Sequence, residues 1–179
     1  MDQLWWQFFS WAVVLVTLIF LTQRGAVDQG VARALVLSVV KLLVAVSIIG
    51  FGYGLEPSLW LGLTDSPGKG LESLATQLGD NWYGLLSSGF IPGSLALLVA
   101  TAAPNGKEAI QRAAIAVILC LAAADIVFNV VNSRPVENLL FSLFSDVLGG
   151  AIAGILVAKV AGLQAKPRPA PAAPSSEPG

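Results

Sequence analysis

The chain has 179 residues, of which 55% are hydrophobic and only 12% are charged. Soluble domains carry about 25% charged residues, so this composition excludes an ordinary water-soluble domain and predicts an all-α membrane bundle. The formal net charge of −1 argues against a nucleic-acid partner, which would need a basic surface. The sequence has no histidine, and its one cysteine, Cys120, lies in an apolar run. We therefore expect no metal site, no disulfide within the chain and no cofactor.

Five stretches have the roughly 20 mostly apolar residues that a helix needs to cross a bilayer. They are residues 4–22, 34–55, 82–103, 110–131 and 138–161. The first is too long for a signal peptide and has no basic segment before it, so we interpret it as a retained span. Together they predict one five-helix transmembrane domain over residues 1–164. The Pro/Ala-rich tail, residues 165–179, cannot pack a core and should be disordered.

The connections between the spans carry turn and capping signals. Asn105 can cap the fourth span, with Glu108 completing a capping box. Arg134 lies in a short Ser-Arg-Pro turn, which makes the fourth and fifth spans antiparallel neighbours. The outer connection, residues 56–81, has leucines at helical spacing between 71 and 78, which predicts a short amphipathic helix on the outer leaflet. The alternative is an irregular loop whose leucines cover the top of the bundle.

Basic residues in short connections predict the orientation, because they concentrate on the cytoplasmic side. An outer N-terminus and a cytoplasmic C-terminus place most of them inside: Arg24, Arg33, Lys107, Arg112, Lys159, Lys166 and Arg168. The outer side keeps Lys69 and Arg134. Aromatic residues that favour interfaces then fall at the outer ends of the spans: Trp5, Trp6, Tyr53, Trp60, Trp82 and Tyr83. The pattern predicts a multi-pass protein of a cell (inner) membrane.

Ionisable side chains inside a span are costly, so each one points to a role. Asp125 and Asp146 lie at similar depth in the fourth and fifth spans, and the expected packing gathers Asn129 and Arg134 beside them. This candidate cluster has three interpretations. It is a polar staple in which Arg134 neutralises one carboxylate and the other is protonated or bonded to Asn129, a pathway for protons or small cations, or a catalytic pair. Lys41, the other ionisable residue in a span, is expected to extend its ammonium toward the cytoplasmic surface.

Small residues mark the expected packing surfaces. Gly149, Gly150 and Gly154 follow Asp146 along the fifth span and predict a close seam against the fourth. The third span is rich in Gly and Ser between residues 84 and 94, and we expect it to kink and to pack closely.

The spacing Asp125-x-x-x-Asn129-x-x-x-x-Arg134, followed by Asp146, resembles the last part of VanZ-like membrane proteins, which pair an acid, an amide and an arginine before a final helix. The resemblance covers only this part of the chain, and the spacing differs from the family's. The family's histidine-bearing segment has no counterpart in a chain without histidine, so no residue role is taken from it.

The sequence contains no nucleophile elbow, metal motif or phosphate-binding loop, so we expect a protein that is not an enzyme. The leading hypothesis is a small integral membrane protein, a structural or assembly subunit that packs against partner membrane proteins or against itself. The first alternative is a channel or transporter for protons or small cations that uses Asp125 and Asp146. The second is a membrane enzyme or accessory factor that acts on lipid-linked substrates.

The predicted orientation can be tested with reporters. A reporter fused after Gly179 should be active only in the cytoplasm, because the basic residues hold the tail inside. A cysteine at Ser66, in a variant that lacks Cys120, should be labelled by an impermeant reagent in intact cells. Activity of the fusion only outside the cytoplasm, or labelling only after permeabilisation, would reverse the orientation.

Overall fold

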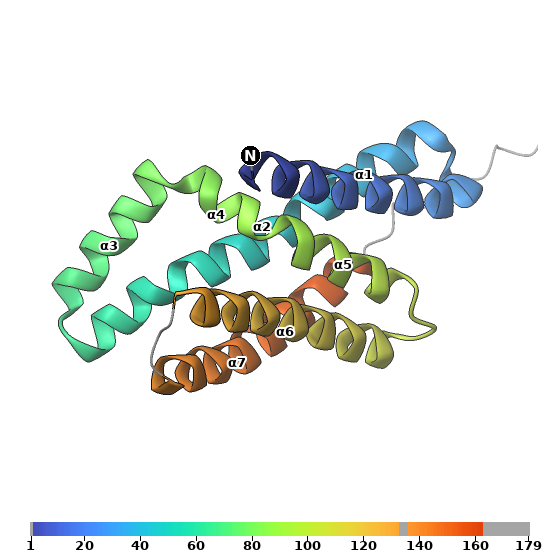
Figure 1. The fold of residues 1–179 in the computed structure, drawn as a ribbon. Coiled ribbons are helices and arrows are strands. Elements are labelled where there is room, and N and C mark those ends of the chain that lie inside the picture. Colours follow the sequence, from blue (N-terminus) through green and yellow to red (C-terminus); the bar gives the residue numbers. More distant parts are fainter. Residues whose placement is uncertain (1, 133–135, 163–179) are drawn as a thin grey trace, which may run out of the picture.

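The computed structural model describes residues 2–132 and 136–162, and these residues form helices and short connections (Figure 1). The helices are α1 (Asp2–Gln29), α2 (Val31–Thr64), α3 (Pro67–Asp80), α4 (Trp82–Ser88), α5 (Phe90–Thr101), α6 (Gly106–Val131) and α7 (Val136–Ala161). In the described part of the chain, five helical stretches are long and apolar enough to cross a membrane, with α4 and α5 together making one of them. The predicted helical class and number of such stretches are therefore confirmed.

The second span is longer than the sequence predicts. It does not end at residue 55, because α2 continues through Pro57 to Thr64. Proline lacks the amide hydrogen that would bond to the carbonyl one turn earlier, and this loss usually ends or kinks a helix. Packing against a neighbouring helix can compensate for it. The expectation that the outer connection begins at residue 56 is therefore wrong.

The neighbour that packs against the end of α2 is α3, which folds back along it as a hairpin. The hydroxyl oxygens of Ser58 and Ser73 lie 2.8 Å apart across this contact. A Cβ added to Gly70 would lie only 2.6 Å from the Cα of Gly62, so the two backbones almost touch. The predicted 56–81 connection thus consists of the last turns of α2 and a helix, α3, that contains the leucines noted in the sequence.

Gly89 interrupts the third span and separates α4 from α5. Pro92 falls in the first turn of α5, where amide hydrogens have no partner within the helix, so the break precedes the proline. Gly89 and Gly93 both face α2. A Cβ on Gly93 would lie 2.8 Å from the Cα of Val46, and one on Gly89 would meet the Val46 carbonyl. The third span therefore bends where it touches α2.

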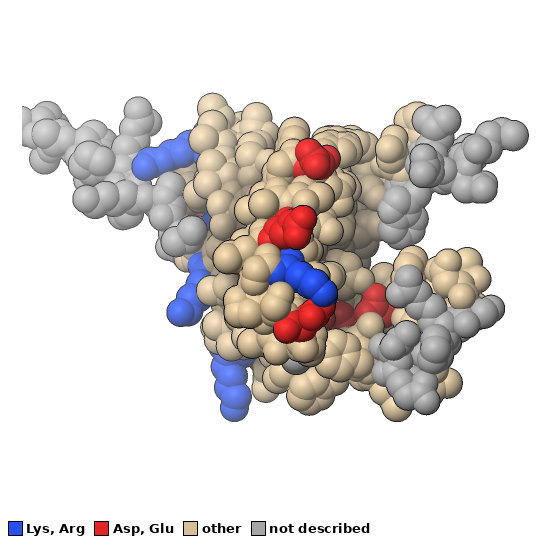
Figure 2. Space-filling model, turned by 90° about the vertical axis from the view of Figure 1, so that its left-hand side faces the viewer, with Lys and Arg blue, Asp and Glu red and all other residues tan. Residues whose placement is uncertain are grey.

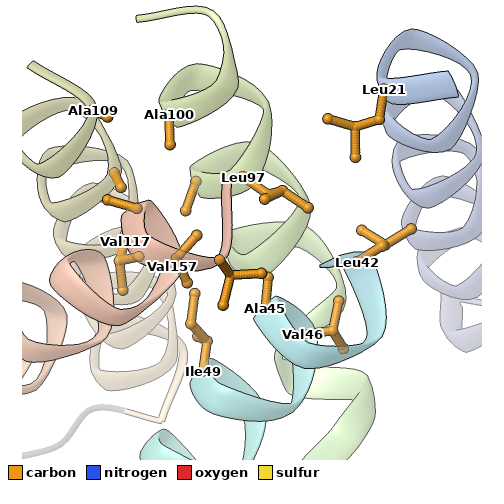
Figure 3. Packing of buried hydrophobic residues seen from close by; sticks show 14 of the residues in the cluster. Leu21, Leu42, Ala45, Val46, Ile49, Leu97, Ala100, Ala109, Val117 and Val157 are labelled. Atoms are coloured by element: carbon orange, nitrogen blue, oxygen red, sulfur yellow. The ribbon is translucent and has the colours of Figure 1, made fainter. Parts of the chain in front are cut away.

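The core lies where α2, α5, α6 and α7 meet (Figure 3). Its fully buried side chains come from all four helices and include Ala45, Ile49, Leu97, Val117 and Val157. α7 packs along α6, whereas α1 contacts α2 and α5 at the edge of the bundle (Figure 1). The outward faces of the long helices carry many exposed large apolar side chains, a surface far more apolar than that of a soluble monomer.

At the end of the bundle away from α3, basic side chains bind the C-terminal ends of neighbouring helices. Arg24 of α1 donates from Nη1 to the carbonyl of Thr101 at 2.6 Å. Lys41 of α2 donates from Nζ to the carbonyl of Ala161 at 2.8 Å. A cation in this position satisfies a free carbonyl and complements the helix dipole. The Lys41 ammonium, which we expected to extend toward the membrane surface, binds the end of α7 and so joins α2 to it.

The two ends of the bundle differ in charge. Figure 2 views the molecule from the α3 end and shows acidic side chains on that face. The described acidic residues there are Glu56, Asp65, Glu72 and Asp80, and the one described basic residue, Lys69, is paired with Asp65 at 2.5 Å. The described basic residues of the opposite end are Arg24, Arg33, Lys41, Lys107, Arg112 and Lys159, which outnumber its acidic residues Asp28 and Glu108.

Two glycines of α2 provide a matched test of the close contact with the third span. A Cβ on Gly50 would meet the carbonyl of Leu85 and lie 3.2 Å from the amide nitrogen of Gly89, whereas one on Gly52 would meet nothing within 4 Å. Gly50→Ala should lower the free energy of unfolding by about 1–3 kcal/mol through overpacking. Gly52→Ala should leave it unchanged or raise it, because alanine favours a helix. Thermal unfolding in mild detergent measures both, and equal stabilities would contradict this packing.

Candidate functional site

Polar side chains of α2 and α6 meet inside the bundle. Asp125 of α6 is 8% exposed, and its Oδ1 accepts a hydrogen bond of 2.6 Å from the Tyr53 hydroxyl of α2. Tyr53 and Asp125 therefore tie together two helices that are 72 residues apart in the sequence.

Asn129 lies one turn beyond Asp125 and is also buried. Its Nδ2 donates to the main-chain oxygen of Asp125 at 2.8 Å, so the amide group is used within α6. It is not bonded to the Asp146 carboxylate, although one form of the predicted staple has a carboxylate bonded to Asn129. Arg134, the predicted ion-pair partner, lies outside the described residues. The partner that the structure gives to the Asp125 carboxylate is the hydroxyl of Tyr53.

Asp146 of α7 is the most deeply buried ionisable residue of the described chain, with 1% of its surface exposed. Neither of its carboxylate oxygens has a hydrogen-bond partner among the described residues. The carboxylates of Asp125 and Glu56 lie close enough to interact with it electrostatically. The structure thus brings the two predicted aspartates together and adds Glu56 of α2. We call Glu56, Asp125 and Asp146 the acidic cluster.

The acidic cluster can act on protons or on positively charged groups. In the described residues, no group of His, Cys, Asp and Glu has the arrangement of a metal site. A buried carboxylate without a partner carries a large desolvation cost, which a bound proton or an added donor would remove. Asp146 is therefore the member of the cluster with unused binding capacity.

Cavities lie on both sides of the acidic cluster. On the Asp146 side, a mostly apolar groove of about 460 Å³ runs between α2 and α7, and we call it the α2–α7 groove. On the Asp125 side, a cavity of about 470 Å³ lies between α2, α4 and α6, where Asn129 also contributes to the wall. Tyr53 and Glu56 line both, so they form the wall between the two halves of the site.

The glycines of α7 divide between two surfaces. Gly150 and Gly154 face α6: a Cβ on Gly150 would lie 2.6 Å from Cγ1 of Ile118, and one on Gly154 would meet the backbone of Ala114. Gly149 does not belong to this seam, since a Cβ there would meet nothing within 4 Å. Successive helical residues point about 100° apart, and Gly149 accordingly lines the α2–α7 groove.

The sequence pattern does not single out Tyr53 or Glu56 as site residues. It places Tyr53 at the outer interface, because aromatic side chains favour this position, and Glu56 in a connection, because the apolar stretch ends at residue 55. The signal that identifies them is their spacing from Ile49, four and then three residues, which puts all three on one face of a longer helix. Ile49 is part of the core, so that face points inward.

Comparisons with protein-family models, with curated protein sequences and with solved structures find no match to this chain. The resemblance of the Asp125–Asp146 segment to VanZ-like proteins therefore gains no support from them. The function is argued from the residues and their arrangement.

The contact between Tyr53 and Asp125 can be tested by removing one oxygen. Tyr53→Phe leaves the buried carboxylate without this donor and should lower the free energy of unfolding by about 1–3 kcal/mol. The same change should cost much less in an Asp125→Leu background, because the carboxylate is then absent. Tyr83→Phe is the control, since Tyr83 is the other tyrosine of the chain and its ring is exposed. Thermal unfolding in detergent measures the stabilities of the wild type, the two single variants, the double variant and the control. An equal loss in both backgrounds would mean that the hydroxyl does not serve Asp125.

Proposed function

We propose that this chain is a multi-pass integral membrane protein of a cell (inner) membrane, with its N-terminus outside and its C-terminus in the cytoplasm. It acts as a structural or assembly subunit and is not an enzyme. Five long apolar stretches and widely exposed apolar faces support insertion in lipid. The basic end of the bundle, opposite the acidic α3 end, supports the orientation, because basic residues stay in the cytoplasm.

The observation that carries the structural role is how polar side chains are used. Charged side chains take part in contacts between helices that are far apart in the sequence: Arg24 joins α1 to α5, Lys41 joins α2 to α7, and Asp125, through Tyr53, joins α6 to α2. In each contact, a charged group is hydrogen-bonded to a backbone carbonyl or to another side chain. Polar groups used in this way stabilise a bundle and leave few that are free to act on a substrate.

Purification in mild detergent tests the assembly role. We expect the chain to elute in a complex whose protein mass is well above its own 18.6 kDa, with at least one other membrane protein present in fixed ratio. Asp125→Asn should change thermal stability and leave the composition of the complex unchanged, because Asp125 is already paired inside the chain. A monodisperse monomer in several mild detergents would rule the assembly role out.

Transport of protons or small cations is the second candidate, and the acidic cluster is the observation that favours it. Asp146 has unpartnered oxygens and two further carboxylates within electrostatic range. The purified protein in liposomes would then conduct, and Asp146→Asn would abolish the flux while unfolding at a normal temperature. Lys69→Gln, at an exposed ion pair in the α2–α3 connection, is the control and should not change the flux. Absence of flux from the wild-type protein removes this candidate.

A further inference from the structure

The α2–α7 groove contains a buried acidic side chain with no hydrogen-bond partner among the described residues. Asp146 lines this groove, is 1% exposed and has no hydrogen-bond partner on either oxygen. The lining is otherwise mostly apolar and comes from α2 and α7 with Val117 and Leu121 of α6, although Glu56 also lies in it. A carboxylate in such surroundings requires a donor or a cation, because the desolvation of an unpaired charge is costly. A bound proton would remove this cost, and so would an occupant of the groove that combines an apolar body with a positive or hydrogen-donating group.

The shape of the groove fits a helix. Its α2 wall runs from Ile48 to Leu63, fifteen residues or about 22 Å along the helix. Gly52 and Gly149 stand on opposite walls, and a Cβ on either would meet nothing within 4 Å. Small residues on an open helical surface allow another helix to approach closely, and a polar residue among them supplies the specific contact.

We propose that a transmembrane helix of a different membrane protein docks in the α2–α7 groove and pairs a Lys or Arg side chain with Asp146. This inference rests on the proposed assembly role and names the surface and the chemistry of the partner. A charge pair inside the bilayer neutralises both residues, so an acidic residue on one subunit calls for a basic residue at the same depth on the other.

The position of Asp146 disfavours a lipid amine in this role. Asp146 is ten residues, or about 15 Å, from the start of α7 at Val136, whereas lipid headgroups stay at the membrane surface. A second copy of the chain fits no better. A two-fold contact through this groove would place one Asp146 opposite the other. Lys41, the basic residue deepest in a described span, is already bound at Ala161, about 22 Å along α7 from Asp146.

Photo-crosslinking in native membranes tests the groove directly. A photoreactive residue replaces either Ile152, which lines the groove, or Leu119, an exposed residue of α6 that serves as the control. We expect position 152 to crosslink to one transmembrane segment of another protein, with a Lys or Arg at the depth of Asp146, and position 119 not to reach it. Crosslinks from position 152 only to lipid, only to a second copy, or to a segment without a basic residue would overturn the proposal.

Substitutions in the groove provide the energetic test. Asp146→Lys should reduce the position-152 crosslink by roughly tenfold or more, and replacing the partner's basic residue by Asp should restore it. Gly149→Leu should reduce it as well, by filling the groove, and it leaves the α6 seam untouched, so it remains informative if Asp146→Lys does not fold. A crosslink that survives Gly149→Leu contradicts the docking site.

The failure of this proposal can be told apart from failure of the assembly role. A complex of higher mass without the position-152 crosslink keeps the assembly role and places its interface elsewhere. A monomer without the crosslink removes both.

Discussion

The bundle depends on the close approach of helix backbones at a few glycines. Gly50, Gly89 and Gly93 bring α2 against the third span, and Gly150 and Gly154 bring α7 against α6. Lipid chains are as apolar as the side chains of a bundle, so helices in a membrane associate through tight packing and polar contacts. These seams also position the site. Gly50 lies one turn before Tyr53 on α2, and Gly150 lies one turn after Asp146 on α7, so the packing that holds each helix also fixes the depth of its polar residue.

Polar side chains add hydrogen bonds between helices that pack closely at the glycines. Lys41 and Arg24 bind helix ends at one end of the bundle, and the Tyr53–Asp125 contact lies nearer the α3 end. Each of these contacts joins helices that are far apart in the sequence and meet only in the folded protein. Asp146 is the exception, because it is as buried as any of them and has no such link among the described residues. In the proposed function, this exception is where the protein relies on another subunit.

The sequence was sufficient for the helical class and for the long apolar stretches, because span length and hydropathy leave clear patterns. It was not sufficient to identify which side chains and helices contact one another. Tyr53 was assigned to the interface because aromatic side chains favour it and the apolar stretch ends at residue 55, and the contact with α3 beside Pro57 has no local signature. Gly149 was grouped with Gly150 because both are small, although neighbouring residues on a helix face different directions. Such contacts depend on how helices are rotated, which periodicity alone does not fix.

The length of α2 constrains how the molecule sits in a bilayer. Its 34 residues make a rod of about 50 Å, whereas a hydrocarbon core is about 30 Å thick. Even a tilt of about 40°, at the upper end of what spanning helices adopt, shortens its projection only to about 38 Å. In the proposed membrane protein, part of α2 therefore projects beyond the lipid, and α3, packed back along that part, projects with it. The serine contact and the paired glycines between α2 and α3 then act as a brace for a rigid extramembrane protrusion, whose height is set by helix length and not by the folding of a separate domain.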